Sequence, residues 1–373
     1  MSQGKVVLFA GGGTGGHLYP ALALADELKR RDPDGRVAFM GTPHRIEATL
    51  VPQAGYAFYP VEVKGMPRKI GPELLGFAKA LAGSLVEARR VLKELKPDVV
   101  VGTGGYVSAP ALIAAALEGV PAMICEQNVF PGIANRLLSR LVREVATTFP
   151  ESDAYFPKGK AHCLGNPIRS EVYALSQEEA RARLGFVETP HLLVVTGGSL
   201  GARSINRALT GALPDLLAHE DWSILHVSGK NDHAEVEEAT RGQRERYRLV
   251  PYMEDLPVAL AASDLVLSRA GATTVAELTA AGKPMVVVPF QHGGKDQPAN
   301  ARALMEAGAA LALDDRDLSG LGETLSGLMS DPECRQRMGQ ASRRFGRPEA
   351  AEVIAGRILT LAASSRFSPG IVS

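Results

Sequence analysis

Short apolar runs recur along the chain, and patterns typical of helices separate them. In the first half these runs cover residues 6–10, 37–40, 99–102 and 122–125. They are continuously apolar rather than alternating, which is typical of parallel strands covered by helices on both faces. After residue 190 the alternation resumes, with runs at 191–196, 222–227, 247–250, 264–268 and 283–289. The pattern predicts an α/β fold with two doubly wound parallel sheets.

The two halves also resemble each other. Residues 5–17 and 191–203 both predict a strand, a glycine-rich loop and a helix start, and residues 98–125 repeat the pattern of 264–289. Loops at the carboxyl ends of parallel strands build ligand sites, so two such domains would surround one cleft. We expect Rossmann-like domains over residues 1–165 and 166–347. A last helix at about 348–363 is expected to pack back on the first domain.

Composition narrows the class of protein. The chain has 373 residues, and its 41 Lys or Arg balance 41 Asp or Glu, which removes a whole-chain electrostatic argument for nucleic-acid binding. Cys125, Cys163 and Cys334 lack a Cys-x-x-Cys spacing, so we interpret them as reduced cytosolic thiols. No export signal is visible. Glycines and a proline interrupt the uncharged stretch 99–117, which favours strand, loop and helix over a membrane span.

Two glycine loops are candidates for phosphate binding. Residues 11–16 fit Gly-x-Gly-x-x-Gly, and residues 197–201 repeat the strand, loop and helix arrangement. Close strand–helix packing is the alternative for either loop taken alone. Residues 38–42 offer no acidic side chain for a ribose, which argues against NAD. A helix is expected over residues 18–31. His17, just before it, is a candidate general base, with capping or packing as its alternative.

Polar residues at predicted strand and helix ends extend the candidate site. Glu126 and Asn128 directly follow an apolar strand, although an ordinary loop would look the same. Glu277 lies behind a small-residue loop, where it could accept ribose hydroxyls or complement a helix dipole. Gln297 and Asn300 could read sugar hydroxyls, whereas capping is the simpler explanation for Asn300.

One segment predicts contact with a membrane surface. Residues 64–96 carry eight Lys or Arg and three Glu, a net charge of +5, interleaved with leucines and a phenylalanine. This combination suits docking on an anionic membrane, and a core-facing amphipathic helix is the alternative. Two Asp-x-Asp sequences are better explained as solvated turns, so we expect no metal site.

In order along the chain, seven motifs resemble the MurG family of bacterial UDP-N-acetylglucosamine (UDP-GlcNAc) transferases, which convert lipid I to lipid II in peptidoglycan synthesis. The motifs are Gly11-GGTGGH17, Gly102-TGGYVSAP110, Glu126-QN128, Gly165-NPIR169, Gly197-GSLGAR203, Ser268-RAGATTVAE277 and Asp296-QPAN300. The resemblance implies a GT-B fold, no cofactor, and a peripheral location at the cytoplasmic face of the plasma membrane. The implied partners are UDP-GlcNAc, undecaprenyl-linked lipid I and the membrane surface, without nucleic acid.

The family's binding residues carry over to positions of this chain. They are Thr14, Gly15, Gly16, Asn128, Arg169, Ser199, Met253, Ala272, Thr273, Thr274, Val275, Ala276, Glu277 and Gln297. The resemblance implies that Glu277 holds the ribose, that Ser199 lies by the diphosphate, and that Tyr106 faces the acceptor. Asp296 stands where His or Gln is usual, and Met253 where an aliphatic residue often contacts uracil.

We therefore expect an inverting transfer of GlcNAc to the 4-hydroxyl of the N-acetylmuramyl sugar of lipid I. His17 is the first candidate for the base and Glu126 the second, while helix ends and Arg169 would stabilise the departing diphosphate. The alternatives are a UDP-GlcNAc epimerase, another GT-B lipid glycosyltransferase and a non-catalytic sugar-nucleotide sensor. The basic, apolar segment 64–96 argues against the epimerase.

Overall fold

A computed structural model describes residues 4–65, 73–169, 171–188, 190–198, 201–243, 245–291 and 295–364. The chain divides into two compact units. One unit contains the residues up to Pro167 together with those from Glu349 onward, and the other runs from Ile168 to Pro348. Each unit is built on one parallel sheet, as the apolar runs predict.

The first unit has a seven-stranded sheet with the order β3-β2-β1-β4-β5-β6-β7. Its strands are β1 (Val6–Gly11), β2 (Arg36–Gly41), β3 (Ala57–Pro60), β4 (Val99–Gly104), β5 (Ala122–Glu126), β6 (Glu144–Thr147) and β7 (Ala161–Cys163). Its helices are α1 (Gly15–Arg31), α2 (Glu47–Gln53), α3 (Glu73–Leu95), α4 (Ser108–Leu117), α5 (Ile133–Leu138), the 3-10 helix η1 (Pro150–Tyr155) and α15 (Ala350–Ser364).

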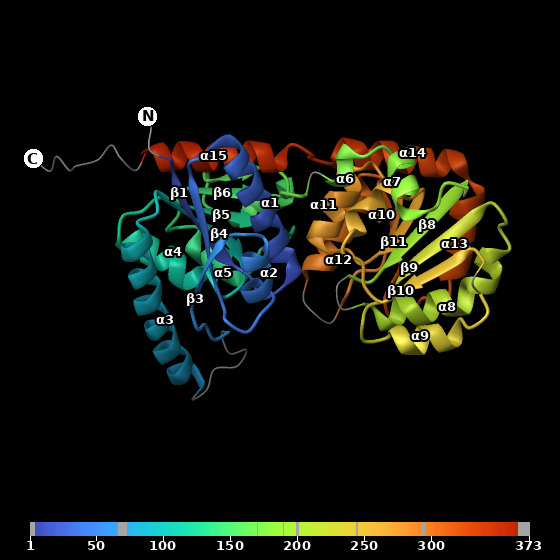
Figure 1. Cartoon of the computed structure of the whole chain (residues 1–373), viewed down its shortest axis with the longest axis horizontal. Coiled ribbons are helices and arrows are strands. Elements are labelled where there is room, and N and C mark those ends of the chain that lie inside the picture. The colour runs from blue at the N-terminus through green and yellow to red at the C-terminus, as the bar shows by residue number, and fades with distance from the viewer. Residues whose placement is uncertain are drawn as a thin grey trace, which may run out of the picture. The chain divides into compact units, whose positions relative to one another are not determined.

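Both faces of this sheet are covered by helices (Figure 1). Successive residues of a strand point to opposite faces, and the core follows this rule. Leu8 packs in a cluster with residues of α3 and α4, whereas Phe9 packs in a second cluster with residues of α1 and α15. The strand sequences are continuously apolar because both of their faces are buried.

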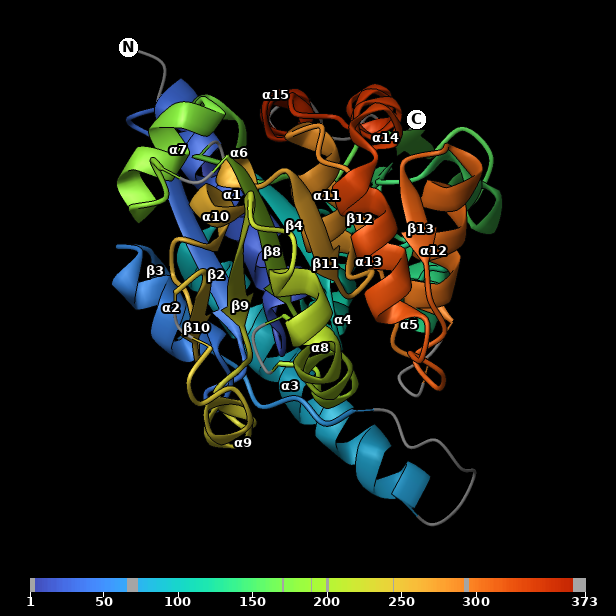
Figure 2. The same cartoon turned by 90° about the vertical axis from the view of Figure 1, so that its right-hand side faces the viewer.

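The second unit repeats this design with six strands in the order β10-β9-β8-β11-β12-β13. Its strands are β8 (His191–Thr196), β9 (Trp222–Val227), β10 (Tyr247–Val250), β11 (Leu265–Ser268), β12 (Met285–Val287) and β13 (Ala310–Ala312). Its helices are α6 (Glu171–Ala174), α7 (Gln177–Leu184), α8 (Arg203–Leu217), α9 (His233–Ala239), α10 (Leu256–Ala262), α11 (Ala272–Ala280), α12 (Asp296–Glu306), α13 (Leu321–Ser330) and α14 (Pro332–Phe345). Figure 2 shows α8 and α13, which pack in one core cluster with β8 and β11.

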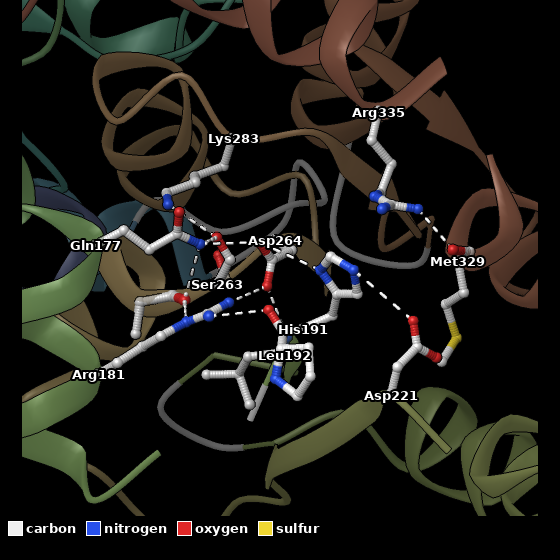
Figure 3. Close-up of polar contacts among 12 residues, drawn as sticks. Gln177, Arg181, His191, Leu192, Asp221, Ser263, Asp264, Lys283, Met329 and Arg335 are labelled. Carbon is white, nitrogen blue, oxygen red and sulfur yellow. Dashed lines mark hydrogen bonds and ion pairs between the residues drawn. The ribbon is translucent and has the colours of Figure 1, made fainter. Parts of the chain in front are cut away.

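An aspartate just before the fourth strand of each sheet shows how closely the two halves correspond. The carboxylate of Asp98 accepts a hydrogen bond of 2.8 Å from the amide of Val6, and that of Asp264 accepts one of 2.7 Å from the amide of Leu192. Asp264 also pairs with Arg181 of α7 (Figure 3). In each sheet this aspartate holds the amino end of the central strands together.

Two regions bear on the sequence predictions. Residues 99–117 form β4 and α4 with a glycine turn between them, as expected. Helix α1 begins at Gly15, three residues before the expected start, so its first turn includes His17. Across the described ranges, no helix combines the length and the apolar character needed to cross a membrane.

Candidate active site

The glycine loop after β1 is shaped by a buried carboxylate. Glu47 is 1% exposed, and its Oε2 accepts a hydrogen bond of 2.9 Å from the amide of Gly13. Its Oε1 accepts from the amide and the hydroxyl of Thr42, at 3.1 and 2.7 Å. Gly12 has φ +147°, and a Cβ there would lie 2.4 Å from the Glu47 carboxyl carbon. Glycine is therefore required at this position, and Thr14 beyond it is exposed to solvent.

His17 lies at the carboxyl ends of three strands. Its Nδ1 is 3.2 Å from Oε1 of Gln127, which follows β5. A Cβ on Gly104, at the end of β4, would lie 2.6 Å from the same Nδ1, so the imidazole packs directly on this backbone. Gly104 also has φ +105°, which a side chain rarely adopts. The structure thus brings the first glycine loop and the Glu126–Asn128 motif together.

Glu126 is 3% exposed and uses both carboxylate oxygens. Oε1 accepts from the amide of Asn128 at 3.0 Å. Oε2 accepts from the amide of Gly132 at 3.3 Å and from Nδ2 of Asn135 at 2.8 Å. Burial raises the pKa of Glu126, and these donors oppose that shift. The carboxylate therefore holds the loop between β5 and α5.

Asn128 and Tyr106 lie on the loops after β5 and β4. Asn128 is half-buried, and its carbonyl oxygen accepts a hydrogen bond of 2.9 Å from the hydroxyl of Ser152. Tyr106 is 58% exposed, and its ring lies next to Gly65. The side chain of Tyr106 is thus available to a ligand.

In the second unit, Arg169 and Glu277 face each other. Nη2 of Arg169 is 3.9 Å from Oε1 of Glu277, which lies in the second turn of α11 and is 5% exposed. The first residues of α11 follow Gly271 directly, so their amides mark a helix N-terminus at the carboxyl end of β11. A cation, a carboxylate and a helix N-terminus therefore belong to one region of this unit.

Helix α12 supports the same region. Nδ2 of Asn300, which is fully buried, donates to the carbonyl oxygen of Ala270 at 3.1 Å. Asn300 therefore fixes the loop before α11, and the N-cap of α12 is Lys295 without a side-chain cap, so the capping explanation is wrong. Oε1 of Gln297 accepts a hydrogen bond of 2.9 Å from the amide of Phe290.

The other predicted binding residues differ in what they can offer a ligand. Ala272 and Val275 are buried, so only their backbone could contact one. The remaining residues of this run are half-buried, namely Thr273, Thr274 and Ala276. Met253 is half-buried in the loop after β10. Ser199 lies outside the described residues.

The sequence assigned no role to a half-buried ion pair between Arg269 and Asp315 in the second unit. Nη1 of Arg269 is 2.6 Å from Oδ1 of Asp315, and its Nη2 donates to Ser204 at 3.0 Å. This contact joins the loop after β11 to the start of α8 and the loop after β13. The arginine within the Ser268–Gly271 motif was the available signal, but its partner is distant in sequence. Among the described residues, no group of three or more His, Cys, Asp or Glu side chains could hold a metal ion.

Two family models match this chain, one for each unit. The family model of the glycosyltransferase family 28 N-terminal domain matches residues 7–147, and that of the family 28 C-terminal domain matches residues 192–354. The class defined by the fold and its two loop regions is therefore that of family 28 glycosyltransferases.

Individual relatives narrow this class. A UDP-N-acetylglucosamine–N-acetylmuramyl-(pentapeptide) pyrophosphoryl-undecaprenol N-acetylglucosamine transferase of Desulfitobacterium hafniense is 43% identical, over 93% of this chain and 97% of its own length. The crystal structure of MurG from Acinetobacter baumannii is 28% identical with a TM-score of 0.75, covering 95% of this chain and 99% of that one. The chain belongs to the MurG family, and the predicted GT-B fold is confirmed.

A UDP-GlcNAc 2-epimerase from Neisseria meningitidis, crystallised with UDP-GlcNAc, has a TM-score of 0.67 at 16% identity. The alignment covers 95% of this chain and 99% of the epimerase. At this level of identity the likeness concerns the fold alone.

Proposed function

We propose that this chain transfers GlcNAc from UDP-GlcNAc to the 4-hydroxyl of the N-acetylmuramyl sugar of lipid I, giving lipid II with inversion at the anomeric carbon. The observation that carries the proposal is 43% identity across 93% of the chain to a transferase whose name states this donor and acceptor. The inverting course follows from the family resemblance.

The second unit is proposed to hold the donor. Glu277 would accept hydrogen bonds from the ribose hydroxyls, because a buried carboxylate can accept two donors at once. Arg169 and the N-terminus of α11 would stabilise the negative charge of the diphosphate. Gln297 would contact the sugar, and Met253 the uracil.

The first unit is proposed to hold the acceptor and the base. The muramyl 4-oxygen forms a bond to the anomeric carbon, and the bond from that carbon to the β-phosphate oxygen breaks. Nε2 of His17 takes the hydroxyl proton, while the electron pair leaves with UDP. Amides of the segment from Thr14 to Gly16, in which Thr14 and Gly16 are exposed, would bind the acceptor pyrophosphate.

Glu126 is the weaker candidate for the base. Both of its oxygens already accept hydrogen bonds from the loop that carries Asn128. Taking a proton would weaken three contacts that hold this loop. We therefore assign Glu126 a positioning role for Asn128 and the catalytic role to His17.

The first unit is also proposed to dock on the cytoplasmic face of the membrane without spanning it. Of the basic segment 64–96, residues 66–72 lie outside the described residues. In α3 the side chain of Val86 is 70% exposed, and in α5 those of Ile133 and Leu137 are 65% and 58% exposed. Arg136 lies between the two α5 residues in sequence. Exposed apolar side chains beside cations suit an anionic lipid surface.

The test is UDP release from UDP-GlcNAc plus a lipid I analogue, with and without EDTA and with a reaction lacking acceptor. Release that needs the acceptor and tolerates EDTA supports a metal-independent transferase. Release without acceptor contradicts the proposal and favours an epimerase or a hydrolase. Binding of UDP-GlcNAc without any release favours a sensor.

A matched pair of variants separates donor binding from general damage. Glu277→Gln removes the charge of the proposed ribose ligand, and we expect the KM for UDP-GlcNAc to rise about 10-fold or more. Glu323→Gln, in the first turn of α13, changes the same residue type elsewhere in the unit and should leave the KM unchanged. Equal KM values for the two variants would contradict the role of Glu277.

A further inference from the structure

The side chain of Gln127 contacts two strand ends and helix α1 of the first unit. Its Nε2 donates hydrogen bonds of 3.0 Å to the carbonyl oxygen of Thr103 in β4 and of 3.0 Å to that of Cys125 in β5. Its Oε1 lies 3.2 Å from Nδ1 of His17 in α1. Gln127 is 2% exposed, so water does not compete for these contacts.

These contacts allow only one orientation of the amide. A carboxamide nitrogen carries two hydrogens, and both are used on main-chain carbonyl oxygens, which cannot donate. Rotating the amide by half a turn would place Oε1 against two carbonyl oxygens, and none of these three acceptors could donate to another. The oxygen of Gln127 must therefore face His17.

We infer that Gln127 is a positioning residue that fixes the tautomer of His17, with the hydrogen on Nδ1 and the lone pair on Nε2. An amide oxygen accepts only, so the neutral imidazole can complete this contact only by donating from Nδ1. Nε2 has no hydrogen-bond partner among the described residues, and its lone pair is directed away from Gln127. This inference rests on the proposed role of His17, because a base needs its lone pair on the nitrogen that meets the substrate.

The tautomer can be measured without substrate. We would label the eight histidines with ¹⁵N, record imidazole spectra at about pH 8, where neutral imidazole dominates, and assign His17 by the signals lost in His17→Gln. A pyridine-like Nε2 and a pyrrole-like Nδ1 at His17 are expected. A pyrrole-like Nε2 in the wild-type protein would overturn the inference whatever the variants do.

The variant Gln127→Met keeps the length of the side chain and removes the acceptor. His17 should then exchange between both tautomers, and kcat should fall about 10-fold or more, because only part of the population holds its lone pair correctly. The KM for UDP-GlcNAc should not change. An unchanged His17 tautomer in Gln127→Met would also overturn the inference.

Gln177→Met is the matched control (Figure 3). The Nε2 of Gln177 also donates to two main-chain carbonyl oxygens, those of Ala262 and Ser263 at 3.2 and 3.0 Å, and in addition to Oδ1 of Asp264 at 3.0 Å. Gln177 is exposed, and among the described residues no histidine donates to its side chain. Because Gln177 is exposed, this variant should lose less stability than Gln127→Met, and it should keep kcat and the His17 spectrum. If the proposed reaction itself is wrong, wild-type turnover is absent but the tautomer assignment still stands or falls on the spectrum.

Discussion

Two histidines, one in each unit, each have one ring nitrogen in contact with a side-chain amide oxygen. They differ in whether the other ring nitrogen also has a hydrogen-bond partner. Oε1 of Gln127 lies 3.2 Å from Nδ1 of His17, and Oδ1 of Asn206 lies 3.0 Å from Nε2 of His226. Each amide nitrogen is used elsewhere. That of Asn206 donates to the carbonyl oxygen of Ser228 at 2.9 Å and to Asp232 at 3.2 Å.

The second ring nitrogen distinguishes His226 from His17. Nδ1 of His226 accepts from the hydroxyl of Tyr247 at 2.8 Å, and the residue is fully buried. Burial lowers the pKa of His226 to about 3. His17 is half-buried and bonded on one side only, as far as the described residues go. A histidine with both nitrogens bonded belongs to the core, whereas one bonded nitrogen orients the ring and leaves the other for chemistry.

The largest effect is expected from His17→Ala, which removes the open nitrogen. Turnover with the lipid I analogue should fall about 10²- to 10⁴-fold, the range that general-base catalysis contributes. The measurement is the steady-state rate of UDP release, with folding checked by the thermal unfolding midpoint.

His44→Ala is its control, because the side chain of His44 is 78% exposed and contacts only Glu62 among the described residues. It should keep the wild-type rate. Near-normal turnover in His17→Ala, together with loss of turnover in Glu126→Ala, would assign the base role to Glu126.

His226 should make the free energy of unfolding depend on pH. An unfolded His226 binds a proton below about pH 6.5, whereas the folded one does so only near pH 3. The unfolded state therefore binds more protons between these values. This group's contribution to the free energy of unfolding is complete above pH 6.5 and should fall by about 1.4 kcal/mol per pH unit below it.

Urea titrations from pH 7 to pH 5 would measure this slope. Other carboxylates and histidines also titrate in this range, so the informative quantity is the difference between the wild-type protein and His226→Phe. The variant is expected to be less stable at pH 7 and to lose less stability on acidification. Parallel slopes for the two proteins would show that His226 is not held neutral by its surroundings.

The sequence was sufficient for the class of fold because the strands are buried on both faces. Residues 6–10 and 191–196 could not alternate polar and apolar positions without placing polar groups in a core. The start of α1 was placed too late, since Gly15 and Gly16 are poor helix formers. The structure nevertheless includes them in the first turn.

The candidate site was only partly predictable. His17 was predicted from its place between a glycine loop and a helix, and Glu126 from its place after an apolar strand; both patterns are local. The contact of His17 with Gln127 spans 110 positions and depends on β1, β4 and β5 being neighbours in the sheet. Likewise, two of the three donors to Glu126 come from the loop after β5 and the third from α5, and the residue pattern does not specify the path of this loop.

The smallest effect is expected from removing the hydrogen bond between Tyr247 and Nδ1 of His226. Tyr247→Phe removes the hydroxyl that donates to Nδ1 while keeping the ring, and burial raises the pKa of Tyr247 to about 12, so this hydroxyl is protonated. The buried Nδ1 would lose its donor, and stability should fall by about 1–2 kcal/mol. Tyr252→Phe is the control because Tyr252 is 37% exposed. Turnover should be unchanged in both variants, since a residue that only closes a core histidine has no part in the reaction. Equal unfolding midpoints in urea for Tyr247→Phe and the wild-type protein would mean that this hydrogen bond does not contribute to stability. Burial alone would then distinguish His226 from His17.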